Sequence, residues 1–439
     1  MATARRSVAV SGVSPARIRA RLSTPMAYLG ILGGLQVGLL WILHAHFGIW
    51  LAALATAILA LLLVVLRAVS GRWAWKLALL YSLVALTTLA PTLMGLVERP
   101  RVGITMEHDG MIQIEAAIDR VMRGQPIYGV DWSSTPLGRM PWTLTSGPNP
   151  AVHHLAYFPL TVLAGVPVRA LTNLLGLPFD YRLVLLLASL LGLTAIAAIP
   201  ITPERRFMVT TAVFLSPLIS LFLWSGRNDI EFLALVLASL ALLARGHPVL
   251  ASGALGTAMA LKPFALFAAP FLLLVLFLRW KNGAGRRELL MSLVALAVVP
   301  VATIAPFFLM DPRSFWTDTI LYTSGGVRDA YPIGGYGFGA LLLALHLVAR
   351  PTSSFPFGLL QVPAVLATLW VAGRRFLRSP TMGRWMAGYA LVFLAFAFFA
   401  RFFNDSYVGV VVTLGLCAIP LGSALLRVPV IASSDRLAA

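Results

Sequence analysis

The sequence predicts an all-α fold, a polytopic bundle of roughly 11 to 13 transmembrane helices. Hydrophobic residues make up 59% of the 439 residues and charged residues only 11%, a balance that excludes a water-soluble folded chain of this size. Apolar runs at 51–66, 183–199 and 289–309 approach or reach the roughly 20 residues that a helix needs to cross ~30 Å of hydrocarbon. These runs lack the alternation of barrel strands, so we expect helices.

The basic residues lie in short clusters between the apolar runs. The formal net charge of +18 is typical of nucleic-acid-binding proteins, but clusters of this kind are cytoplasmic anchors under the positive-inside rule. The arginines between Arg5 and Arg21 therefore place the N-terminus in the cytoplasm. We predict a multi-pass protein of the cell (plasma) membrane with no nucleic-acid partner. A single cysteine, Cys417, excludes an intramolecular disulfide and a cysteine-based metal cluster.

The charges divide the chain into segments on alternate sides of the membrane. The predicted order is a basic cytoplasmic tail (1–25), three transmembrane helices (26–97), an external loop (98–154), a helix bundle (155–427) with a second external loop near 311–336, and a cytoplasmic tail (428–439). Nine of the sixteen acids fall in the two external loops, 98–154 and 311–336. This enrichment indicates an external working face.

Some helices of the bundle are expected to be broken or re-entrant. Between His154 and Arg205, and again between Tyr336 and Arg374, two apolar stretches occur where one crossing would satisfy the charges. The run 250–278 is likewise interrupted at Lys262. Such breaks survive in a membrane only when they are buried in protein or line a cavity.

The first external loop contains the strongest candidate for a catalytic residue. Asp109 starts a helix-like stretch with Met111, Ile114 and Ile118 on one apolar face, suited to lying on the membrane surface. Aspartate at this position is a good helix N-cap, and a carboxylate fixed at a helix start also stays ionised, as a general base must. Glu107 is the second candidate base, and His108 either orients one of the two acids or is solvated.

Three later groups are candidates for phosphate or sugar binding. Lys262 lies within an apolar run, at a cost of about 2.5 to 3.5 kcal/mol unless it snorkels or is paired. It therefore either marks a helix end near the interface or contacts a phosphate in an external cavity. The other candidates form a turn and a late loop, which hairpin geometry explains nearly as well: Arg227, Asn228, Asp229, Arg401 and Asn404.

Aromatic residues follow the first surface helix. Tyr128, Trp132 and Trp142 suit the interfacial aromatic belt, and they are also able to stack on a sugar. Tyr157 opens the next apolar run.

Four short motifs occur in a fixed order. Asp109 and its helix precede Gly124 and the Pro-Ile-Tyr element 126–128, and the element 157–159 reads Tyr-Phe-Pro. The turn 226–229 reads Gly-Arg-Asn-Asp, and a helix rich in small residues ends at Lys262 and Pro263. This order resembles the GT-C membrane glycosyltransferases that use polyprenyl-phosphate sugars, in particular the polyprenol-phosphate-mannose-dependent α-mannosyltransferases of the phosphatidylinositol-mannoside type.

The chain departs from the family pattern at four places, one of which is the turn 226–229, an imperfect match to the expected Gly-Gln-x-Asn. The expected Tyr-Pro-Pro element has Phe158 in its middle, and two late polar elements are replaced by the segments 334–339 and 402–407. These departures bear on the choice of sugar more than on the general class.

The resemblance implies a reaction and a set of roles. A hexose, mannose above all, would pass from a polyprenyl-phosphate donor to a lipid or glycan acceptor at the external face, with inversion. Asp109 would accept the proton of the acceptor hydroxyl, while Lys262, Arg227 or Arg401 would hold the leaving phosphate. The remaining candidates would contact sugar or acceptor: His108, Tyr128, Trp132, Tyr157, Asn228, Asp229 and Asn404.

No cofactor is predicted. Asp109 with Glu107 or Asp229 offers oxygen ligands for a divalent metal, but no spacing in the sequence requires one.

Two other classes share part of this signature. A secondary transporter also has broken helices and buried polar groups, but no repeated halves are visible and the acids concentrate in loops. A lipid-linked glycan polymerase or ligase usually has its large loop late in the chain, whereas this chain has it early.

Overall fold

A computed structural model describes residues 24–104, 107–140, 142, 149–422 and 424–426. The N-terminal arginine cluster, nearly all of the predicted tail 1–25 and the whole tail 428–439 lie outside these residues. Within them the all-α membrane fold is confirmed. The strands found there are two residues long, and β1 (Gly334–Gly335) pairs in parallel with β2 (Phe402–Phe403).

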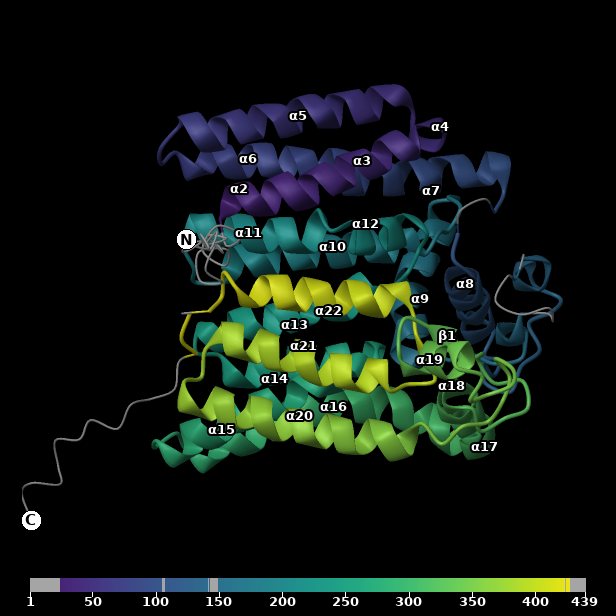
Figure 1. The fold of residues 1–439 in the computed structure, drawn as a ribbon. Helices are drawn as coiled ribbons and strands as arrows, with labels where there is room; N and C mark the ends of the chain where they lie inside the picture. Colours follow the sequence, from purple (N-terminus) through teal and green to yellow (C-terminus); the bar gives the residue numbers. More distant parts are fainter. Residues whose placement is uncertain (1–23, 105–106, 141, 143–148, 423, 427–439) are drawn as a thin grey trace, which may run out of the picture.

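The first layer of the bundle is formed by the three long helical runs predicted over 26–97. Figure 1 shows them stacked at one side of the molecule. Two of the runs contain a π-helical turn, which lets the run bend without ending. Their elements are α2 (Pro25–Tyr28), η1 (Leu29–Gly33), α3 (Gly34–Ile42), α4 (His44–Phe47), α5 (Ile49–Ala68), α6 (Trp73–Val84), η2 (Ala85–Leu89) and α7 (Ala90–Val102).

The second layer surrounds one buried helix, α13. Most of its side chains are buried where it packs between α10 and α14, and only a narrow stripe along one face (Leu235, Ala238 and Leu242) is partly exposed. The elements of this layer are α9 (Pro159–Leu174), α10 (Arg182–Ala198), α11 (Pro203–Phe214), α12 (Pro217–Trp224), α13 (Asp229–Ala244), α14 (Pro248–Leu261), η5 (Pro263–Ala268), α15 (Ala269–Lys281) and α16 (Arg286–Met310).

Helices at the periphery expose their apolar side chains. In α16, Ser292 is buried while residues such as Val294 and Val301 are more than half exposed. The described residues contain five helices long and apolar enough to cross a membrane, α16 and α5 among them. Surfaces of this kind are stable only against lipid. The number of crossings, predicted as 11 to 13, stays a prediction.

The predicted break at Lys262 is confirmed. Lys262 has extended backbone angles (φ −146°, ψ 126°) between α14 and the 3-10 turn η5. Pro263 cannot donate the backbone hydrogen bond that would continue α14, and it disfavours helical angles at the residue before it. The break therefore presents the Lys262 side chain at the end of a buried helix.

The predicted external loops meet at one end of the bundle. In Figure 1, α8 (Asp109–Met122), α17 (Pro312–Trp316), α18 (Tyr322–Ser324) and α19 (Phe338–Ala344) gather at the right-hand end. The remaining elements are η3 (Pro136–Arg139), η4 (Pro150–Val152), η6 (Thr317–Leu321), α20 (Gly358–Arg378), α21 (Met382–Phe398) and α22 (Asp405–Ala418). The chain turns from α20 into α21 at the opposite end, beside basic residues such as Arg378 and Arg384. The turn between α20 and α21 thus carries bases without acids, whereas the two acid-rich loops lie at the other end.

Candidate functional site

The first helix of the predicted external loop, α8, begins at Asp109 as predicted, but its N-cap is His108. The Nδ1 atom of His108 accepts the N–H of Gly110 at 3.0 Å, so Asp109 is the first residue of the helix and not its N-cap. A carboxylate in the first turn still interacts favourably with the helix dipole.

The apolar face of α8 is buried in protein and does not lie on a membrane surface. Met111, Ile114 and Ile118 are at most 1% exposed, and α8 packs on α9. The expected surface helix is therefore wrong in its placement: the predicted external loop folds over the bundle and covers α9 with this face.

The Asp109 carboxylate is held on both oxygens. Its Oδ1 accepts the N–H of Gly110 at 2.8 Å and lies 3.0 Å from Nδ1 of His108. Its Oδ2 accepts the side-chain amide of Asn149 at 3.0 Å. Burial alone would raise the pKa of Asp109, but His108, the Asn149 amide and the Gly110 N–H together hold it well below its usual range. Asp109 is thus ionised at neutral pH, and its side chain keeps 24% exposure.

The turn 225–229 packs directly against the start of α8. The N–H of His108 donates to the carbonyl of Ser225 at 2.7 Å. Gly226 has a positive φ of 87° and lies so close to Met111 that a Cβ there would overlap its sulfur. Gly110 is equally constrained, because a Cβ there would overlap the hydroxyl of Tyr157. These contacts bring Asp109, Tyr157 and the predicted Arg227–Asp229 turn together.

Lys262 reaches the same turn from the end of α14. Its Nζ donates to Asp229 Oδ1 at 2.6 Å and to Asn228 Oδ1 at 3.2 Å, and it lies 5.3 Å from the ring centre of Phe264. The second Asp229 oxygen, Oδ2, is buried and has no hydrogen-bond partner within the described part of the chain. Lys262, which would be costly in lipid without a partner, is thus paired with Asp229, an acid that is itself buried.

Arg227 and Asn404 line the other side of this group. Arg227 Nη1 donates to Asp405 Oδ1 at 2.6 Å, and both side chains are partly exposed. Asn404 donates to the hydroxyl of Tyr331 at 3.2 Å. The charges of both Asp109 and Arg227 act on the phenols of Tyr331 and Tyr157. Burial raises the pKa of Tyr157, which therefore stays a neutral hydrogen-bond donor.

Arg401 is placed apart from this group, among backbone carbonyls. Its guanidinium donates to the carbonyls of Tyr331, Ser353 and Pro351. Burial lowers the pKa of Arg401. These bonds tie the segment 331–353, which contains β1, to the residue that precedes β2.

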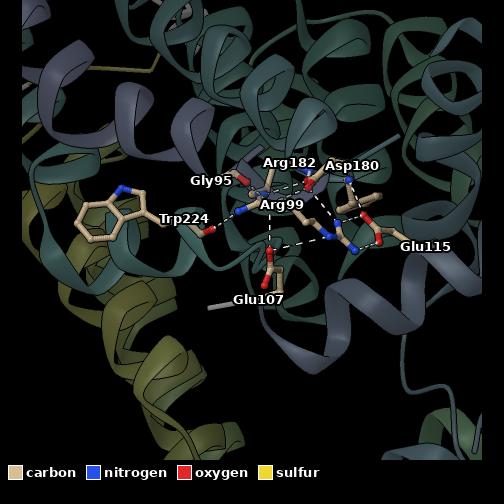
Figure 2. A network of polar contacts seen from close by, with 8 residues as sticks. Gly95, Arg99, Glu107, Glu115, Asp180, Arg182 and Trp224 are labelled. Carbon is tan, nitrogen blue, oxygen red and sulfur yellow. Dashed lines mark hydrogen bonds and ion pairs between the residues drawn. The ribbon is translucent and has the colours of Figure 1, made fainter. Parts of the chain in front are cut away.

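Glu107 belongs to a different cluster, shown in Figure 2. Its Oε1 lies 3.2 Å from Nη2 of Arg182 and 3.8 Å from Nε of Arg99. Arg99 forms a fork with both oxygens of Glu115 at 2.6 and 2.8 Å. Asp180 accepts from both arginines, at 2.7 and 2.9 Å. Burial opposes ionisation of Asp180, but Arg182 and Arg99 hold its pKa below its usual range.

This second cluster fixes the position of α8. It joins α7 through Arg99, α8 through Glu115 and the start of α10 through Arg182. The carbonyls of Gly95 and Trp224 take further donors of Arg182. Glu107, two residues before Asp109, is therefore anchored inside the protein by the two arginines.

The predicted belt aromatics are internal. Trp132 is 1% and Tyr128 6% exposed. The Tyr128 hydroxyl donates to the carbonyl of Tyr157 at 2.8 Å, and its ring packs edge-on against Phe315. Trp132 lies 5.9 Å from the guanidinium of Arg120. The belt interpretation is wrong for these two residues, which order the loop instead.

Two cavities open beside the site. The larger, of about 670 Å³, lies between the 129–131 loop and α17–η6 and is lined by Asp131, His153, His154, Trp316 and Asp318. The smaller, of about 330 Å³, shares His153 and reaches Asn149, the residue that holds Asp109. The larger volume lies within the 300–1,000 Å³ typical of small-molecule sites.

Several site residues were not found by sequence reasoning. Asn149 and Tyr331 lie in irregular segments where no spacing marks them. Glu231, which accepts from Tyr181 at 2.6 Å inside the bundle, was overlooked. Asp318 did carry a signal, because it is a single acid within the apolar stretch 315–322. An acid in such a stretch indicates a buried partner.

Comparison with known proteins identifies the class. Residues 154–400, more than half of the chain, match the sequence model of glycosyltransferase family 87. The protein is therefore a membrane glycosyltransferase of the GT-C type, and it belongs to glycosyltransferase family 87. No curated protein and no solved structure matches the chain. Among the described residues, no group of three or more His, Cys, Asp or Glu side chains is arranged to hold a metal ion.

Proposed function

We propose that the protein transfers a hexose, mannose above all, from a polyprenyl-phosphate sugar to a lipid or glycan acceptor, with Asp109 as the general base. The observation that carries this proposal is the meeting of an ionised, partly exposed carboxylate with two cationic side chains, Lys262 and Arg227, at one end of the bundle. An acceptor hydroxyl needs a base, and a phosphate leaving group needs cations.

In the reaction, the acceptor oxygen forms a bond to the anomeric carbon as the bond from that carbon to the phosphate oxygen breaks. The hydroxyl proton passes to Asp109, and polyprenyl phosphate leaves as an anion beside Lys262 and Arg227. A single displacement of this kind inverts the anomeric centre. Because the pKa of Asp109 is low, proton transfer is expected late, when bond formation has made the hydroxyl acidic.

The phosphate would compete with carboxylates for its cations. Lys262 is paired with Asp229, and Arg227 with Asp405. Donor binding is then an exchange of partners rather than entry into an empty cationic pocket. Arg401 is assigned to loop structure in this scheme, because three carbonyls take its donors.

The acceptor would approach through the two cavities. Trp316, half exposed at the larger cavity, offers an apolar ring face for a sugar, and the exposed carboxylate of Asp131 is able to accept hydrogen bonds from hydroxyls. His153 lines both cavities, and the smaller one is also lined by Asn149. We place this end of the bundle outside the plasma membrane, because the turn from α20 to α21 at the opposite end carries arginines and no acids, as cytoplasmic loops do.

Sugar transfer in isolated membranes tests the proposal. Membranes containing wild type, Asp109→Asn or Glu107→Gln are given a panel of radiolabelled polyprenyl-phosphate sugars, with rates corrected for the amount of folded protein. One donor should be consumed, and Asp109→Asn should lower the rate by about 10² to 10⁴-fold. Glu107→Gln should keep most of the rate per folded molecule, and the product should have the anomeric configuration opposite to that of the donor.

Other outcomes contradict separate parts of the proposal. Loss of transfer in Glu107→Gln alone would move the base to Glu107. Folded wild type that consumes no donor but passes a solute in proteoliposomes would replace glycosyl transfer by transport.

A further inference from the structure

The two external loops are joined by a histidine held between two aspartates. Nδ1 of His154 lies 2.9 Å from Oδ1 of Asp318, and Nε2 lies 3.1 Å from Oδ1 of Asp329. The imidazole stacks on the ring of Tyr322 at 4.7 Å. Asp318 is nearly inaccessible and also accepts the N–H of Gly129 at 2.9 Å. The first loop is thus bound to the late loop at two points, Gly129 and His154.

His154 is the last residue of the segment 149–154, whose first residue, Asn149, contacts the proposed base Asp109. Gln113, one turn into α8, donates its amide to the carbonyls of Ala151 and His154 at 2.7 and 2.9 Å. Asn149 accepts the N–H of Ala151 at 3.0 Å and donates to Asp109 at 3.0 Å. The segment 149–154 therefore has Asp109 bound at its first residue and the aspartate pair at its last.

We propose that His154 is a positioning residue for the transfer reaction, which acts through Asn149 to fix the orientation of the Asp109 carboxylate. This inference rests on the proposed function of Asp109. The bridge holds the segment 149–154 against α8, and the Asn149 amide then sets the plane of the carboxylate. A base held in one orientation gains rate because the reacting atoms need no further alignment, and a displacement of about 1 Å costs as much as 10²-fold.

The bridge depends on both ring nitrogens carrying a proton. Nδ1 hydrogen-bonds Asp318, whereas Nε2 lies within ion-pair distance of Asp329 but has no hydrogen bond of good geometry among the described residues. An imidazolium, with a proton on both nitrogens, carries the positive charge that attracts Asp329, whereas a neutral imidazole does not. Three groups face the ring: Asp318 from η6, Asp329 from the late loop and the Tyr322 phenol from α18. The next residue in the chain, His153, lies 3.8 Å from Asp131. Burial alone would lower the pKa of His154, but Asp318 and Asp329 raise it above 6.5. The bridge is therefore complete below the ordinary histidine pKa and is lost as the pH rises through the raised pKa of the folded protein.

A merely structural histidine would not produce the following kinetic pattern. His154→Gln should lower kcat by about 10- to 100-fold with little change in the KM for the donor, since no donor contact is lost. The wild-type kcat should fall on the alkaline side, and this fall should be absent in His154→Gln. Asp329→Asn should keep kcat at neutral pH within a few-fold and weaken the alkaline fall, because the new amide is able to donate to the unprotonated Nε2 of a neutral ring while Nδ1–H still serves Asp318. His247→Gln, an exposed histidine at the start of α14, is the matched control.

A second measurement judges the inference separately from the proposed function. Amide hydrogen exchange of wild type in detergent should speed up in 149–154 as the pH passes the fall in kcat, after correction for intrinsic rates, and His154→Gln should show fast exchange at every pH. Unchanged exchange and an unchanged pH profile in His154→Gln would overturn the inference. If wild type transfers no sugar but exchange behaves as expected, the proposed function fails while the link between His154 and the Asp109 segment stands.

Discussion

Glu107 and Asp109 are two residues apart in the sequence, yet they belong to charged clusters of opposite character. The Glu107 cluster is closed: two arginines and three acids satisfy one another, with two carbonyls taking further donors of Arg182. The Asp109 group is open. Asp109, Arg227 and Lys262 are partly exposed, and the buried Oδ2 atom of Asp229 lacks a hydrogen-bond partner among the described residues. A closed cluster fixes structure, whereas an open one leaves capacity for a ligand.

The largest effect on stability should come from opening the closed cluster. Arg182→Gln removes the cation that contacts Glu107 and Asp180, and both carboxylates stay buried. Breaking a buried pair in this way lowers the free energy of unfolding by about 3 to 5 kcal/mol. Thermal unfolding in detergent measures the change.

An exposed ion pair provides the control for Arg182. Arg169 lies 3.1 Å from Asp119 with both side chains accessible, so Arg169→Gln should cost at most about 1 kcal/mol. Equal losses in the two variants would show that the Arg182 cluster does not hold α8 in place.

In the open group, substitutions should change the rate of sugar transfer more than the free energy of unfolding. Lys262→Gln removes the proposed contact with the leaving phosphate, and kcat/KM for the donor should fall by about 10² to 10³-fold. The variant also leaves Asp229 buried without its cation, so its stability should fall as well.

A double variant separates these two consequences. Lys262→Gln with Asp229→Asn restores electrical neutrality and should recover most of the lost stability without recovering transfer. If the double variant regains full activity, Lys262 serves only to neutralise Asp229, and the phosphate is bound elsewhere.

A smaller effect is expected where the two clusters meet at the start of α8. Gly110→Ala places a methyl group against the Tyr157 hydroxyl, and overpacking of this kind costs about 1 to 3 kcal/mol. Tyr157→Phe removes that hydroxyl. Unfolding of the two single variants and the double variant should show that Tyr157→Phe relieves much of the cost of Gly110→Ala. Strictly additive losses would contradict the close approach.

Much of the fold follows from local sequence features. Apolar runs predict the helices because every backbone polar group in lipid must be bonded within its own segment. The break at Lys262 was predictable because Pro263 disfavours a continuing helix. The start of α8 at Asp109 followed from the apolar spacing of Met111, Ile114 and Ile118.

The partners of the charged residues were not predictable in the same way. Lys262 was expected to need a partner, but Asp229 is 33 residues away and meets it only through the packing of α13 on α14. Asn149 and Asp109 are 40 residues apart and meet through loop geometry. Periodicity reports which face of a helix is buried; it carries no information on which distant side chain lies opposite. The same limit explains why Glu107 and Asp109 were indistinguishable as candidate bases.

The smallest effect should come from the rim of the open group. Asp405 pairs with Arg227 at 2.6 Å, but the Asp405 side chain is 42% exposed, so Asp405→Asn should change stability by less than about 1 kcal/mol. If phosphate and Asp405 compete for the same guanidinium, removing this carboxylate should lower the KM for the donor by a small factor while kcat stays constant. Arg227→Gln should raise that KM. A KM that rises in both variants would mean that the pair acts as one structural unit, like the cluster around Arg182, and that Lys262 alone meets the phosphate.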